Sequence, residues 1–289
     1  MTDVIDFIRE PWTFEFMRRA LLAAVLVSAV SAVVGSYVIL KGMAFIGDAL
    51  PHASFGGVAA AFVLGGNLYV GGAVAALITA LLIGVLSRRG VVRHDTAIGI
   101  LFVAAFALGV LLVSREPNYT GDLFTFVFGN VLAVSWNDVW LTLAIATAVL
   151  VLVIVFYKEL LFTSYDPTMA AAVGLPVDVL QFGLLALLAL TTVIALQTVG
   201  IVLVVALLVT PAATAQLLTR TLPAMMALGA AFGVVSSVAG LYIAWYADVS
   251  ASAAIVLAAT ALFGAAFLLA PGRGALWRPI LARQPEAGM

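Results

Sequence analysis

The sequence contains no cysteine, few charged residues and only two histidines. The absence of cysteine excludes disulfides, thiolate metal sites and cysteine nucleophiles. Charged residues make up 9% of the chain, whereas a soluble globular domain has about 25%. So few charges cannot cover the surface of a soluble protein of 289 residues. They suffice for a protein whose middle faces lipid, where no charge is needed.

Long apolar runs fill most of the chain, in which 65% of the residues are hydrophobic. A membrane-spanning helix needs about 20 mostly apolar residues. We therefore predict an all-α, polytopic membrane protein of eight or nine transmembrane helices. The count stays open because two pairs of segments are separated by little more than a turn. The candidate segments are 17–40, 45–64, 69–86, 96–113, 136–157, 179–197, 200–218, 222–246 and 252–270.

Arginine positions predict the orientation of the chain. Cytoplasmic connections of membrane proteins are rich in Lys and Arg, and both the connection 87–95 and the tail 271–289 contain three arginines. We predict that both are cytoplasmic, and that residues 17–270 form one transmembrane domain after an N-terminal segment, 1–16. Eight spans would place the N-terminus inside and nine would place it outside, which the sequence leaves open.

The predicted cytoplasmic loop 158–178 contains a short helix with a signal at each end. Asp166 is a preferred N-cap residue, and Pro167 suits the first helical position. Gly174 is typical of a helix end, and Pro176 prevents continuation. An alanine-rich helix of this kind can fit a groove on another protein. The alternative interpretation is an interfacial helix that only connects two spans.

An acidic and an imidazole side chain lie four residues apart at the start of the second candidate span. Asp48 and His52 therefore project from one helical face, and ionisable residues inside a membrane segment are candidates for function because they are costly there. Carboxylate and imidazole form half of a site for a divalent first-row metal, and a two-fold dimer would supply four ligands. Three structural alternatives stay open: Asp48 caps the helix, His52 is a hydrogen-bonded interior histidine, or Asp48 pairs with Lys41.

Four further acidic residues lie near the ends of predicted spans. Asp122, in the outer connection 114–135, is a candidate contact for an arriving cation or a partner protein. Asp248, in the last outer turn, has the same ambiguity. Helix capping explains Asp138, and we expect Asp95 to cap the helix that begins at the next residue.

Five segments together resemble the integral membrane permeases of bacterial zinc and manganese ABC importers. In order, they are MAFIGDALPHASFGGVAAAF, HDTAIGI, DLFTFVFGNVLAVSWND, YDPTMAAAVGLP and VGIVLVVALLVTPAATA. The resemblance covers nearly the whole chain. It implies that Asp48 and His52 are a metal-coordinating pair on the translocation path. It also implies that the loop helix docks onto an ATPase through Asp166, Pro167, Thr168, Met169, Ala170 and Gly174.

The resemblance implies a transport subunit and not an enzyme. Such a permease moves divalent metal ions (zinc or manganese, or ferrous iron) across the bacterial inner membrane by alternating access, and it has no permanently bound cofactor. The implied partners are a cytoplasmic ATP-binding subunit, an extracytoplasmic metal-binding protein, a second copy of the chain and the lipid bilayer, with no nucleic acid. The chain itself contains no GxxxxGK[ST] phosphate-binding loop, so the energy source would lie on a separate subunit.

Three other functions fit the sequence less well than metal-ion import. A permease for an iron chelate or a cobalamin-like cofactor would need a wide path without a ligand pair, so the Asp48–His52 pair argues against it. A proton- or sodium-coupled carrier often contains inverted repeats, and none is evident. An intramembrane metalloenzyme would need more ligands, and the sequence contains no HExxH motif.

Overall fold

The computed structural model describes residues 9–88, 92–115 and 131–270, and these ranges are helical without any β-strand. Each of the nine candidate segments forms a long helix, so the all-α prediction is confirmed. The long helices are α2 (Glu15–Leu40), α3 (Ile46–Val63), α4 (Leu68–Ser87), α5 (His94–Val113), α7 (Trp136–Val155), α10 (Val177–Val199), α11 (Ile201–Leu218), α12 (Leu222–Ala247) and α13 (Ala251–Leu269). The short ones are η1 (Val131–Ala133), α8 (Tyr157–Tyr165) and α9 (Pro167–Ala172).

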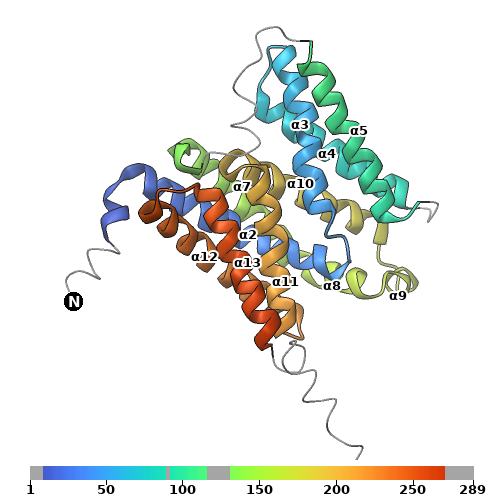
Figure 1. The fold of residues 1–289 in the computed structure, drawn as a ribbon. Helices are drawn as coiled ribbons and strands as arrows, with labels where there is room; N and C mark the ends of the chain where they lie inside the picture. Colours follow the sequence, from blue (N-terminus) through green and yellow to red (C-terminus); the bar gives the residue numbers. More distant parts are fainter. Residues whose placement is uncertain (1–8, 89–91, 116–130, 271–289) are drawn as a thin grey trace, which may run out of the picture.

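Eight helices in the described ranges are long and apolar enough to cross a membrane. The remaining long helix is α3, whose first two turns contain Asp48, Pro51 and His52. Its 18 residues rise by about 27 Å, close to the thickness of about 30 Å of a hydrocarbon core. Helix α3 also packs along both α4 and α5 (Figure 1), so the bundle contains nine long helices in the described ranges.

The helix ends and turns define two opposite ends of the bundle. One end, here called the basic end, is formed by residues 41–45, the end of α4, the start of α5, α8, α9 and the turn 219–221. Its basic residues in the described part are Lys41, Arg88, Arg93, Lys158 and Arg220. The start of α2 lies at the opposite end, where the Trp136 indole nitrogen donates a hydrogen bond of 2.8 Å to the Glu15 carboxylate. If all nine long helices cross the membrane and the basic end is cytoplasmic, as we predict, the start of α2 lies outside.

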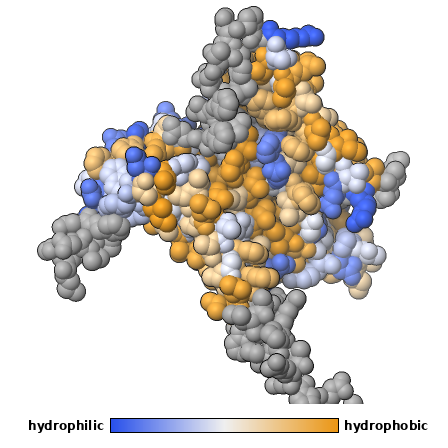
Figure 2. Space-filling view, viewed as in Figure 1, coloured by the Kyte–Doolittle hydropathy of each residue, from blue (hydrophilic) through white to orange (hydrophobic). Residues whose placement is uncertain are grey.

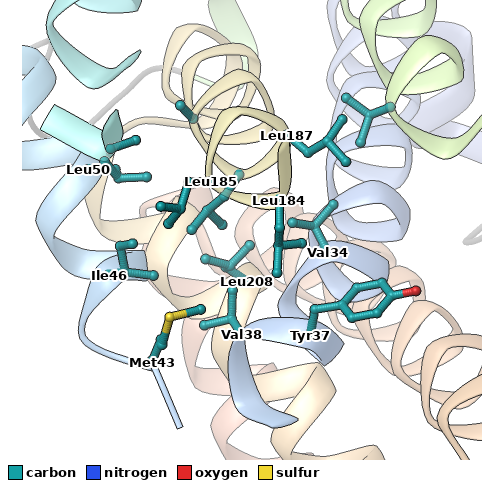
Figure 3. Packing of buried hydrophobic residues seen from close by; sticks show 14 of the residues in the cluster. Val34, Tyr37, Val38, Met43, Ile46, Leu50, Leu184, Leu185, Leu187 and Leu208 are labelled. Atoms are coloured by element: carbon teal, nitrogen blue, oxygen red, sulfur yellow. The ribbon is translucent and has the colours of Figure 1, made fainter. Parts of the chain in front are cut away.

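Helix α2 is the centre of the larger helix group, because it contacts α7, α10, α11 and α12, while α3, α4 and α5 stand together beside it (Figure 1). A core of Val38, Ile46, Leu184 and Leu208 joins α2, α3, α10 and α11 (Figure 3). This core holds the first turns of α3 in place. Figure 2 shows hydrophobic residues over most of the visible face, as expected for a surface in contact with lipid.

Small residues allow close helix contacts in the bundle. A Cβ atom on Gly233 of α12 would lie 3.2 Å from the Cβ atom and the carbonyl oxygen of Ser28 on α2. A Cβ atom on Gly229 of α12 would lie 3.5 Å from the carbonyl oxygen of Pro211 on α11. Glycines spaced by four residues therefore allow α12 to pack closely against α2 and α11 here.

Left-handed backbone conformations explain the shortest turns. Gly200 alone separates α10 from α11, and its φ of +83° is readily adopted only by glycine. Asp248 ends α12 with φ of +51°, a conformation that Asp tolerates better than most residues. Asp248 therefore has a structural role in ending this helix.

One short helix was not predicted, and one local prediction was wrong. Helix α7 ends at Val155, and a second helix, α8, follows within the predicted loop after a break at Phe156. No Gly or Pro lies at that break, so the sequence did not predict it. Asp95 does not cap α5, because α5 begins at His94 and no side chain caps it. By contrast, Ser135 and Asp138 form a reciprocal capping box at the start of α7, which confirms capping by Asp138.

Candidate metal site and docking helix

Asp48 and His52 lie together on the first two turns of α3, on one face as predicted. The Nδ1 atom of His52 is 3.4 Å from the Oδ1 atom of Asp48, and the two side chains are 29% and 49% exposed respectively. Neighbouring α3 residues such as Ala49, Leu50 and Ala53 are buried. The pair is therefore held by a packed helix while its polar atoms stay accessible.

A hydrogen bond to the backbone orients the His52 ring. Nδ1 lies 2.8 Å from the carbonyl oxygen of Asp48. Because a carbonyl oxygen can only accept, Nδ1 must carry the proton in this arrangement. In the neutral form of the ring, Nε2 is then the nitrogen with a free lone pair. Metal-binding histidines usually donate their other ring N–H in this way, so the arrangement prepares His52 to act as a ligand.

Two phenylalanines of α5 flank the His52 ring. Its centroid lies 5.3 Å from that of Phe102 and 6.0 Å from that of Phe106, both in edge-on geometry. These contacts restrict rotation of the imidazole. Sequence reasoning missed both residues, because their role depends on the packing of α5 against α3; the only signal was two phenylalanines four residues apart.

Two of the three structural alternatives for the pair are wrong. Phe45 is the N-cap of α3, and no side chain caps this helix, so Asp48 is not a cap. The Lys41 Nζ atom donates a hydrogen bond of 2.7 Å to Oε1 of Gln181, and no ion pair joins it to Asp48 in the described part. His52 is hydrogen-bonded, but it is only partly buried.

The pair alone is an incomplete metal site. In the described ranges, no group of three or more His, Cys, Asp and Glu side chains could hold a metal ion. A first-row divalent metal takes at least about four ligands, so further ligands must come from elsewhere. Asp122, the candidate at the outer mouth, lies outside the described residues.

The predicted loop helix is present as α9, with the expected signals at both ends. The Asp166 carboxylate accepts a hydrogen bond of 2.8 Å from the Met169 amide, and Pro167 occupies the first turn. At the other end, Gly174 has φ of +90°. The amides of Gly174 and Leu175 donate to the carbonyl oxygens of Ala171 and Ala170, both at 3.0 Å, in the pattern of a Schellman motif.

Helix α9 presents an uncovered face at the basic end. Ala170 is fully buried and attaches the helix to the rest of the molecule. Met169 is 54% exposed and Val173 is 65% exposed, and Pro167, Thr168 and Gly174 are also exposed. An exposed apolar face on a helix with fixed ends is suited to contact with another protein.

Comparisons with known proteins show which proteins this chain is similar to. The model of the ABC 3 transport family matches residues 13–270. The chain is 46% identical over 290 residues to a manganese transport system membrane protein, MntC, of Halalkalibacterium halodurans, with 99% of each chain covered. It is 39% identical over 275 residues to a manganese import system permease protein, ScaB, of Streptococcus gordonii, covering 95% of this chain and 99% of that one.

One solved structure is similar over nearly the whole chain. It is the PsaBC structure from Streptococcus pneumoniae in complex with a Fab, with a TM-score of 0.83 and 39% identity. The match covers 96% of this chain and 99% of that chain.

Proposed function

From the premise that the chain belongs to the ABC 3 transport family, we propose that it is the permease subunit of an ATP-driven manganese importer. It is a multi-pass protein of a bacterial membrane and a transport component. The observation that carries the proposal is the Asp48–His52 pair, in which Nε2 of His52 and a carboxylate lie on one face of the first two turns of α3. The relatives named for manganese transport support the choice of ion.

The ion binds to Asp48 and His52 during transit. One chain supplies two side-chain ligands, so a second copy, related by a two-fold axis, supplies another pair. Carboxylate and imidazole ligands accept Mn²⁺, and they also accept Zn²⁺ and Fe²⁺, usually more tightly. Selection of manganese therefore rests largely on an extracytoplasmic binding protein that delivers the ion, with Asp122 as a candidate contact at the outer mouth.

ATP hydrolysis takes place on a separate cytoplasmic subunit that docks on α9. The exposed face around Met169 and Val173 fits a groove on that subunit, while buried Ala170 transmits its movement to the bundle. The bundle then opens alternately to the two sides of the membrane. A permease for a metal chelate is the weaker candidate, because a chelated ion has its coordination positions filled and would not use a ligand pair.

The test is uptake of radioactive manganese, and separately of zinc, by vesicles that contain the complete complex. Asp48→Asn and His52→Gln should abolish manganese uptake and leave ATP hydrolysis measurable. Asp95→Asn is the matched control, because Asp95 is also in the first turn of a long helix that starts at the basic end. Uptake at the wild-type rate by both site variants would show that the pair is structural. Loss of zinc uptake alone would reject manganese as the substrate.

A further inference from the structure

A cavity of about 460 Å³ lies at the basic end, next to α9, the helix proposed to dock onto the ATPase. It is formed by the end of α2, the last turn of α4, part of α8 and the starts of α9 and α10. No part of the proposed transport path uses it. Its polar walls include Lys41, Arg88, Asp178 and Gln181.

The charges around this cavity do not balance. Arg88 and Asp178 form an ion pair with each other. Lys41 has no carboxylate at ion-pair distance in the part of the chain that the structure describes, and its Nζ atom donates to the neutral Gln181 amide. An ammonium group has three donors, so two remain for another partner. The cavity therefore has a net positive charge, concentrated at Lys41.

Burial makes this charge costly. Lys41 is partly buried, and desolvation lowers its pKa below the ordinary value. A buried cation without an anion is unfavourable, and an anion placed in the cavity would offset that cost. The cavity is thus suited to a negatively charged group.

The position of the cavity indicates which anion it takes. Lys41 directly follows the last residue of the apolar span α2, and Arg88 directly follows α4, so the cavity lies where the bundle leaves the hydrocarbon core. Leu40 and Phe182, both partly exposed, form apolar parts of the wall beside the charged groups. A lipid offers this same combination of an anionic group above apolar chains, and basic pockets between membrane helices bind anionic head groups.

We propose that this cavity binds the phosphate group of an anionic phospholipid through Lys41. Its acyl chains lie against the apolar parts of the wall formed by Leu40 and Phe182. Pro167, the first residue of α9, also lines the cavity. A bound lipid therefore contacts the docking helix and stabilises its position against α2 and α10.

The test measures lipid preference directly in the assembled complex. Spin-labelled phosphatidylglycerol and phosphatidylcholine are compared in vesicles, and the immobilised fraction of each reports its affinity. Lys41→Gln should weaken the preference for phosphatidylglycerol about fivefold, the effect of one basic residue near a membrane surface. Lys41→Arg should keep the preference. Arg220→Gln, which removes a basic residue at the same end but outside this cavity, is the matched control and should also keep it.

Several results would overturn the proposal. One is a wild-type complex without any preference for phosphatidylglycerol, as expected if an acidic side chain of the ATPase fills the cavity. Another is an unchanged preference in Lys41→Gln, or in Lys41→Met should the glutamine variant not fold. Competition by inorganic phosphate that removes the wild-type preference would identify free phosphate, and not a lipid, as the ligand. None of these outcomes depends on metal transport.

Discussion

The contact between α3 and α5 allows a sharp test of how the candidate metal site is held. Gly109 is buried on α5, and a Cβ atom there would lie 2.9 Å from the Cα atom of Gly56 and 2.7 Å from Cδ1 of Phe55. Carbon atoms in contact prefer about 3.5–4.0 Å. Gly109→Ala therefore forces α5 away from α3 by roughly 0.6–1.1 Å. Phe55 is 3% exposed, so its ring has little room to turn aside.

This displacement acts directly on the metal site. Phe106, which contacts the His52 ring, precedes Gly109 by one helical turn and moves with it. Overpacking of this kind costs about 1–3 kcal/mol. If that cost falls on the ion-binding conformation, manganese affinity drops by about five- to 150-fold.

The assay combines thermal unfolding in detergent with manganese uptake by the reconstituted complex. Gly99→Ala on the same helix is the matched control, because nothing lies within 4 Å of a Cβ atom there. It should be neutral, or stabilising by up to about 1 kcal/mol, since alanine favours helices over glycine. Wild-type uptake and stability in Gly109→Ala would refute the claim that this contact positions His52.

Three further predictions concern local structure. Asp166→Ala removes the N-cap of α9 and should destabilise that helix by about 1 kcal/mol. Manganese uptake per ATP hydrolysed should therefore fall, whereas Asp166→Asn, which keeps a capping side chain, should stay close to wild type. Asp248→Val places a β-branched residue at positive φ and should lower stability by about 1–2 kcal/mol, whereas Asp248→Gly should be tolerated; thermal unfolding distinguishes them. The pKa of Lys41 is lower in the folded protein than its ordinary value of 10.5, so the unfolded chain binds more protons between the two values and stability should rise with pH there. Lys41→Met should lose this rise in unfolding measured against pH.

Local signals in the sequence were sufficient for the helices and for the pair on α3. Runs of apolar residues predict the long helices, because backbone groups in lipid must form hydrogen bonds within the protein and a helix satisfies them all. The ends of α9 were predictable for a similar reason, since Asp166 and Gly174 act on backbone groups within a few residues of themselves. Asp48 and His52 share a face through helical periodicity alone.

Features that depend on contacts between helices could not be predicted in this way. The rings of Phe102 and Phe106 meet His52 only because α5 packs against α3. The partner of Lys41 is Gln181, 140 residues away in sequence, whereas the sequence suggested its neighbour Asp48. Such pairings arise from the arrangement of whole helices, about which composition and spacing carry no information.

Helix α10 is the element through which the docking helix can act on the metal pair. The turn after α9 leads directly into α10, and the Leu180 amide bonds to the Pro176 carbonyl oxygen at 3.1 Å in its first turn. Helix α10 then contacts α2, α3 and α4, and its Leu184 and Leu185 share the core that holds Ile46 on α3 (Figure 3). Because a packed core transmits displacement instead of absorbing it, movement of α9 should reach the turns that carry Asp48 and His52. We therefore expect a cavity in this core, as in Leu185→Ala, to lower manganese uptake per ATP hydrolysed more than it lowers ATP hydrolysis itself. Equal losses of both would place the coupling route elsewhere.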